Sequence, residues 1–143
     1  MTSIAIMNAK GGVGKSTITM AIAETLAEHH GRSSLIIDAD GQMSISLMMA
    51  RGGLLSERRE ARLTLVGLFL REVLEDTRTD WPHYVLRDIS DIDEIGGLYL
   101  LPGDMDLPLL EREVAVANKF AAMRASARAL LASAANYVDV VLV

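Results

Sequence analysis

Short apolar runs alternate with amphipathic stretches along the first third of the 143-residue chain. Residues 4–7 form an apolar run that stops at a glycine-rich segment, a pattern that predicts a buried strand. Residues 16–30 predict a helix, with Gly31 as its C-terminal cap. The helix face that we expect to be buried comprises Ile18, Ala21, Ile22, Thr25 and Leu26. Residues 35–37 predict a second buried strand, so that strand, helix and strand form a βαβ unit with parallel strands.

The rest of the chain continues the alternation of helices and strands. We expect a helix at 64–74, loops with a short helix at 76–97, a strand at 98–101, one long or broken helix at 107–136, and a Val-rich central strand at 137–143. This order predicts an α/β fold with a mainly parallel sheet and helices on both faces. The sequence stops at the last strand, so we expect residues 1–143 to be the N-terminal portion of one larger domain.

Composition restricts the classes of function. The net charge is −5, which argues against a surface that coats nucleic acid or anionic lipid as a whole. No cysteine is present, which excludes disulfides, thiolate zinc sites and iron–sulfur clusters in these residues. The N-terminus lacks the pattern of a signal peptide, and no apolar run approaches the roughly 20 residues of a membrane span. A cytoplasmic location is expected.

A glycine-rich segment lies between the first predicted strand and the first predicted helix. It comprises Lys10, Gly11, Gly12, Val13, Gly14, Lys15, Ser16 and Thr17. Glycines let the backbone turn its N–H groups toward an anion, and the following helix offers its positive N-terminus. In such a P-loop, Lys15 reaches the β- and γ-phosphates of a nucleotide, Ser16 binds Mg²⁺, and Thr17 adds a phosphate contact. The usual first glycine of the pattern is Ala9 here.

The lysine before the double glycine makes this segment resemble the deviant P-loop of the ParA/MinD group of ATPases. The resemblance implies a P-loop NTPase fold and MgATP as the ligand. In that family the extra lysine crosses a dimer interface and contacts the partner's nucleotide. By resemblance, Lys10 takes this role, and Lys10, Lys15 and Asp40 are the expected catalytic residues.

A second block, residues 35–42, resembles the family's apolar strand followed by Asp-x-Asp-Pro-Gln. Asp38 and Asp40 are two residues apart and project to one side at the carboxyl end of a strand, where ligands of open α/β sheets bind. The resemblance implies that Asp40 activates water and that Asp38 lies nearer the metal, so the expected magnesium residues are Ser16, Asp38 and Asp40. The alternative is that either Asp caps the next helix. Gly41 replaces the family's usual Pro.

Residues 97–107 and 137–143 resemble two later strands of the family, the second of which normally delivers the Walker B acid after its end. The resemblance implies an ATP-dependent homodimer that binds DNA nonspecifically and is stimulated by a centromere-binding ParB-like protein in plasmid or chromosome segregation. The alternatives are an inactive nucleotide-binding fragment or regulatory module, and a MinD-like membrane-cycling ATPase.

The arginines within 51–62 fit DNA phosphates, but the interleaved glutamates favour a solvated helix face.

Overall fold

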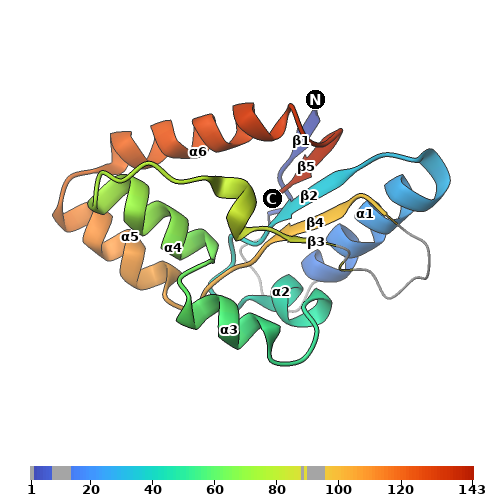
Figure 1. Ribbon diagram of the computed structural model, residues 1–143, viewed down its shortest axis with the longest axis horizontal. Helices are drawn as coiled ribbons and strands as arrows, with labels where there is room; N and C mark the ends of the chain where they lie inside the picture. The colour runs from blue at the N-terminus through green and yellow to red at the C-terminus, as the bar shows by residue number, and fades with distance from the viewer. Residues whose placement is uncertain (1, 8–13, 88, 90–95) are drawn as a thin grey trace.

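A five-stranded sheet with the order β1-β5-β2-β4-β3 forms the centre of the computed structural model (Figure 1). β1 (Thr2–Ile4), β5 (Val140–Leu142), β2 (Ser34–Ile37) and β4 (Leu98–Leu101) are parallel, and β3 (Leu86–Arg87) pairs antiparallel with β4. The structure describes residues 2–7, 14–87, 89 and 96–143.

Helices cover both faces of this sheet, as expected for the predicted α/β fold. They are α1 (Lys15–His30), α2 (Ser44–Met49), α3 (Leu54–Glu60), α4 (Leu65–Phe69), the π-helical turn η1 (Leu70–Leu74), the 3₁₀ turn η2 (Trp81–Tyr84), α5 (Leu107–Val116) and α6 (Phe120–Ala134). No helix among the described residues is both long enough and apolar enough to cross a bilayer.

The two faces of the sheet have separate apolar cores because side chains alternate along each strand. On one face, Leu35 and Ile37 of β2 pack with α4, η1, α5 and α6. On the other face, Ile36 packs with α1 and α2. Figure 1 shows the corresponding three layers, with α4, α5 and α6 on one side of the strands and α1 and α2 on the other. The central strands are therefore buried on both faces.

The limits of α1 are confirmed, but its predicted buried face is wrong. The helix ends at Gly31, whose φ of 57° lets its N–H bond the carbonyl oxygen of Ala27. The fully buried positions are Thr19 and Ala23, whereas Ile18 is 51% exposed. Ala21 and Thr25 of the predicted face are also exposed. Apolar residues lie all around this helix, so their spacing does not select one face.

Several other elements differ from the expected limits. The last strand, predicted at 137–143, is shorter and spans Val140–Leu142. The helical stretch at 107–136 is broken at Asn118, which has a φ of 53°, so of the two alternatives the broken helix is confirmed. The segment expected to hold only loops and a short helix also contains the strand β3. The first strand spans 2–4, although hydrogen bonds between Ile6 and Val143 and between Val143 and Ile4 continue its pairing into the predicted residues.

Candidate functional site

A cleft of about 720 Å³ opens at the edge of the sheet where the parallel strands have their carboxyl ends. Residues 5–7 after β1 and Val143 after β5 form one part of its wall. Lys15 and Ser16 of α1 form another part, and Asp38 and Asp40 after β2 a third. A further part comes from α5, through Leu107, Pro108 and Glu111, and from Gly41 in the loop beside it. Ligand sites of open α/β sheets occupy this position, and their usual volume is several hundred Å³.

The N-terminus of α1 faces this cleft. Gly14 precedes the helix with φ 81° and ψ 17°, a left-handed conformation that favours glycine, and no acidic residue occupies the first turn. Lys15 and Ser16 are half-buried, whereas Thr17 is exposed. Lys10, Gly11, Gly12 and Val13 of the predicted P-loop lie outside the described residues. The described part of the loop therefore offers a lysine, a hydroxyl and a helix N-terminus to an anion.

Asp38 lies in the wall of the cleft, yet its side chain is almost completely buried, with 4% exposed. Its Oδ2 accepts hydrogen bonds from the backbone N–H of Ser46 (2.9 Å) and from the Ser46 hydroxyl (2.5 Å). Its Oδ1 accepts one from the backbone N–H of Asp40 (3.2 Å). Burial raises the pKa of the Asp38 carboxyl above its ordinary value, although the hydrogen bonds from Ser46 and Asp40 oppose this shift.

The helix-capping alternative is true in part for Asp38. Ser46 lies in the first turn of α2, so the bond from its N–H to Asp38 satisfies one of the donors that a helix leaves unpaired at its start. Asp40 instead accepts from the N–H of Gln42 (2.9 Å), a bond that stabilises the loop before the helix. Asp40 is half-buried and lines the cleft.

The residues around the cleft suit Mg²⁺ that arrives together with phosphates. Among the described residues, no group of three or more His, Asp or Glu side chains lies close enough together to form a metal site. Mg²⁺ in nucleotide sites is usually held by few protein ligands, with phosphate oxygens and water completing its shell. Ser16, Asp38 and Asp40 all line the same cleft, so each of the predicted magnesium residues borders the space that a Mg²⁺–phosphate group would occupy.

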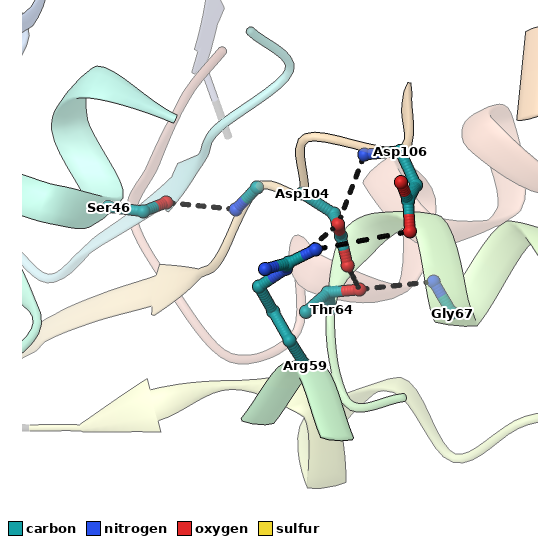
Figure 2. A network of polar contacts seen from close by, with 7 residues as sticks. Ser46, Arg59, Thr64, Gly67, Asp104 and Asp106 are labelled. Carbon is teal, nitrogen blue, oxygen red and sulfur yellow. Dashed lines mark hydrogen bonds and ion pairs between the residues drawn. The ribbon is translucent and has the colours of Figure 1, made fainter. Parts of the chain in front are cut away.

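Sequence reasoning missed a polar network in the loop that follows β4 (Figure 2). Asp104 is buried and accepts hydrogen bonds from Thr64 (3.0 Å) and Arg59 (3.1 Å). The preceding residue, Gly103, donates its backbone N–H to the Ser46 hydroxyl (2.9 Å). The contact partners are far apart in the sequence, so no local pattern indicates them. The Pro102-Gly103-Asp104 turn after a predicted strand is the one local signal.

The chain belongs to the family described as "CobQ/CobB/MinD/ParA nucleotide binding domain", which matches residues 4–141. This finding confirms the predicted family and the predicted P-loop NTPase fold.

Solved structures of similar proteins agree with that assignment. The chain is 25% identical to cobyrinic acid a,c-diamide synthase from Mycobacterium smegmatis with bound ATP analog and magnesium, with a TM-score of 0.67 over 99% of this chain and 50% of that chain. This ligand pair agrees with the expected cofactors, ATP and Mg²⁺. The pNOB8 ParA bound to nonspecific DNA is 22% identical, with a TM-score of 0.66 over 99% of this chain and 44% of that chain, a likeness that shows the fold.

A short stretch also matches an uncharacterized protein of Methanocaldococcus jannaschii, 50% identical over 46 residues, which is 32% of this chain and 17% of that protein. The chain spans about half the length of the solved structures that it matches.

Proposed function

We propose that this chain binds MgATP in the cleft at the carboxyl edge of the sheet. One observation carries the proposal: Lys15 and Ser16, at the start of a helix, line the same cleft as Asp38 and Asp40. The helix N-terminus and the lysine supply positive charge for phosphates, and the hydroxyl and carboxylates supply oxygen ligands for Mg²⁺. The bound ATP analog and magnesium of the cobyrinic acid a,c-diamide synthase support the same ligand for a member of this family.

We further propose that the whole protein hydrolyses ATP. Bound Mg²⁺ would neutralise charge on the transferred phosphoryl group. Lys15 would hold the β- and γ-phosphate oxygens, while Asp40, the more open of the two carboxylates, would orient the attacking water. Asp38 would help to hold Mg²⁺ from its buried position. Lys10 would reach the nucleotide of a second subunit, as its resemblance to the ParA/MinD lysine suggests.

More specifically, we propose that the protein is a partition-type ATPase that dimerises when it binds ATP and is located in the cytoplasm. Its ATP state would bind DNA nonspecifically, and a centromere-binding partner would stimulate turnover. The pNOB8 ParA, which was solved on nonspecific DNA, supports this choice. A MinD-like protein would instead bind lipid vesicles when loaded with ATP, so DNA and vesicle binding with and without ATP separate the two alternatives.

Phosphate release with an Asp40→Asn variant tests the hydrolytic step. We expect the parent to release phosphate in the presence of ATP and Mg²⁺, and the variant to be slower by about a hundredfold because a positioned base contributes on that scale. Asp76→Asn is the matched control, since Asp76 is exposed and pairs with Lys119 outside the cleft. Equal rates for the parent and Asp40→Asn would remove Asp40 from the mechanism, and absence of turnover would favour the inactive nucleotide-binding module.

The Lys10 role has its own test in the oligomeric state. We expect the parent to dimerise with ATP and the Lys10→Ala variant to dimerise much less, because one contact across the interface is removed. Analytical ultracentrifugation with ATP and with ADP measures this difference. A Lys10→Ala protein that dimerises with ATP as tightly as the parent would exclude the cross-interface contact.

A second candidate follows from the similarity to cobyrinic acid a,c-diamide synthase, which exceeds that to the pNOB8 ParA in identity, 25% against 22%. In this candidate the protein uses ATP to activate a carboxylic acid for amide formation, and water is not the acceptor. Phosphate release that requires an added carboxylic acid and an amine donor would support it. Release that DNA stimulates in their absence would support the partition type.

A further inference from the structure

Ser46 connects three segments of the chain behind the cleft. Its side chain is fully buried in α2. Its hydroxyl donates to Oδ2 of Asp38 at 2.5 Å and accepts from the backbone N–H of Gly103 at 2.9 Å. Its own N–H donates to the same Asp38 oxygen at 2.9 Å. One serine thus joins the end of β2, the first turn of α2 and the end of β4.

These contacts leave the two oxygens of Asp38 in different situations. Oδ2 accepts both donors of Ser46, whereas Oδ1 accepts only the N–H of Asp40 among the described residues, at 3.2 Å. An ionised carboxylate oxygen accepts about two hydrogen bonds, so Oδ2 is saturated and Oδ1 retains capacity. Because Asp38 lines the cleft, Oδ1 is the oxygen that is able to serve a ligand there.

Gly103, in the loop after β4, packs against Asp38 as well as bonding to Ser46. A methyl group on this residue would lie 2.9 Å from the backbone oxygen of Asp38 and 3.0 Å from its Cγ, closer than side-chain carbons normally approach. The loop after β4 therefore needs a glycine here in order to lie against the carboxylate. The Gly103 N–H donates to the Ser46 hydroxyl. Figure 2 shows how the following residue, Asp104, is held by Arg59 and Thr64.

We propose that Ser46 is a positioning residue for the magnesium site: it holds Asp38 in one orientation and leaves Oδ1 available to the Mg²⁺ that the cleft would hold. Nothing in the sequence motifs assigns a role to Ser46, and it acts through Asp38 without contacting the nucleotide. Polar partners behind a metal ligand orient it in the same way in other metal sites, and their loss typically weakens metal affinity by about 10–100-fold. This inference rests on the proposed binding of MgATP.

The test is calorimetric titration of the protein with ATP, once in Mg²⁺ and once in EDTA. For the parent, we expect tighter binding in Mg²⁺ than in EDTA. For Ser46→Ala, we expect the gain from Mg²⁺ to fall by about tenfold, while the affinity in EDTA stays that of the parent because Lys15 and the helix N-terminus are unchanged. Ser46→Thr retains the hydroxyl and should restore the gain.

Ser34→Ala is the matched control. Ser34 is also a fully buried serine, located four residues before Asp38 on β2, and its hydroxyl has no hydrogen-bond partner among the described residues. Its loss should leave the gain from Mg²⁺ at the parent value. Circular dichroism shows whether Ser46→Ala is folded. If it is not, Ser46→Cys leaves no cavity, has a much weaker donor and should show the same selective loss.

The possible results separate the inference from the proposed function. Suppose that the parent binds ATP more tightly with Mg²⁺ than in EDTA, and that Ser46→Ala or Ser46→Cys shows the same gain in affinity. The positioning role is then wrong, whereas MgATP binding stands. If both affinities of the Ser46 variant fall equally, the residue is merely structural and the positioning role is again wrong. If the parent does not bind ATP, the proposed function and this inference both fail.

Discussion

At Asp38, burial and hydrogen bonding act in opposite directions. Loss of water disfavours the charged carboxylate and raises its pKa, whereas three donors from Ser46 and Asp40 favour the charged form. A buried carboxylate without such donors would be costly. The stability of this corner of the fold therefore depends on the same hydrogen bonds that orient the side chain toward the cleft.

Replacement by alanine should affect the free energy of unfolding differently at two buried serines. Ser46→Ala should lower the free energy of unfolding by about 2 kcal/mol, because Asp38 and the N–H of Gly103 each lose a buried partner. Ser34→Ala should be neutral or raise it by up to about 1 kcal/mol, because that hydroxyl is buried without a partner among the described residues. Urea denaturation at neutral pH measures both values. Equal destabilisation of the two variants would contradict the hydrogen-bond assignment.

Replacement by alanine should also affect the free energy of unfolding differently at two glycines. Gly103→Ala should lower the free energy of unfolding by about 1–3 kcal/mol, the usual cost of forcing an extra methyl group against packed atoms, here those of Asp38. Gly53→Ala is the control, since no described atom lies within 4 Å of the added methyl and its φ of −76° suits alanine. Gly53 is the N-cap residue of α3, where glycine is favoured over alanine, so that variant should lose less than about 1 kcal/mol. Thermal unfolding of both proteins checks the prediction, which a stable Gly103→Ala protein would refute.

At the scale of elements, the start of α4 is part of the polar network in Figure 2. Thr64 caps the helix by accepting the N–H of Gly67 at 3.2 Å, and its hydroxyl donates to Asp104 at 3.0 Å. Through Asp104, the helix is connected to the loop that lies against Asp38. One hydroxyl therefore stabilises both a helix end and the turn after β4.

Thr64→Ala should lower the free energy of unfolding by about 2–3 kcal/mol, because it removes an N-cap and leaves a buried carboxylate with one donor fewer. Thr64→Ser keeps the hydroxyl and should lose much less. Guanidinium denaturation of the two variants compares them under identical conditions. A Thr64→Ser protein as unstable as Thr64→Ala would assign the effect to the lost methyl group.

Asp139 makes a similar connection at the amino-terminal ends of the strands. It joins the start of β5 to the segment before β2. It accepts hydrogen bonds from the N–H and hydroxyl of Ser33 and from Arg32, and the bonds from Ser33 contribute most to a pKa below the ordinary value of an Asp. A carboxyl group with a lowered folded-state pKa stabilises the fold above its unfolded-state pKa. This contribution disappears as the pH falls through the folded-state pKa.

The stability difference between the parent and Asp139→Asn should therefore be largest near neutral pH and should shrink in acid, below about pH 4. Urea denaturation of both proteins across that range measures it. Asp76→Asn, at an exposed position, serves as the control for general loss of a charge. A difference that stays constant from neutral pH into acid would exclude the ionised Asp139 as its source.

Those elements whose signals are local could be predicted from the sequence. Gly14 and Gly31 mark the ends of α1, and apolar runs mark β2 and β4, because left-handed turns and buried strands need these residue types. The buried face of α1 could not be predicted, since apolar side chains surround the helix. The short antiparallel β3 has no signal of its own, because its pairing with β4 arises from tertiary contact.

In the candidate site, too, some residues could be predicted from the sequence and others could not. Lys15, Ser16, Asp38 and Asp40 could be predicted because they lie in two motifs that resemble those of the family, one at the start of a helix and one at the end of a strand. The structure brings all four to one cleft. Ser46, by contrast, has no motif of its own: its hydroxyl lies between Asp38 and Gly103, the second of which is 57 residues away in the sequence. Such a role depends on the packing of α2 against the sheet, which spacing along the chain does not encode.

At the scale of the whole molecule, the fold places groups from distant parts of the chain around one opening. Residues after β1, β2 and β5, the start of α1 and the start of α5 all contribute to its wall. The parallel arrangement of the strands is what brings these ends to the same edge. MgATP binding at this opening is the central claim, since hydrolysis, dimerisation and the role of Ser46 all depend on it.

Calorimetric titration of ATP in the presence of Mg²⁺ tests that claim most directly, with the parent, Lys15→Ala and Lys119→Ala compared. Lys119 is the matched control because it pairs with Asp76 away from the cleft. We predict that the parent and Lys119→Ala bind ATP equally and that Lys15→Ala binds at least about tenfold more weakly, since a charge-assisted phosphate contact is lost. A folded parent that does not bind ATP, or a Lys15→Ala protein that binds as tightly as the parent, would contradict the assignment of this cleft.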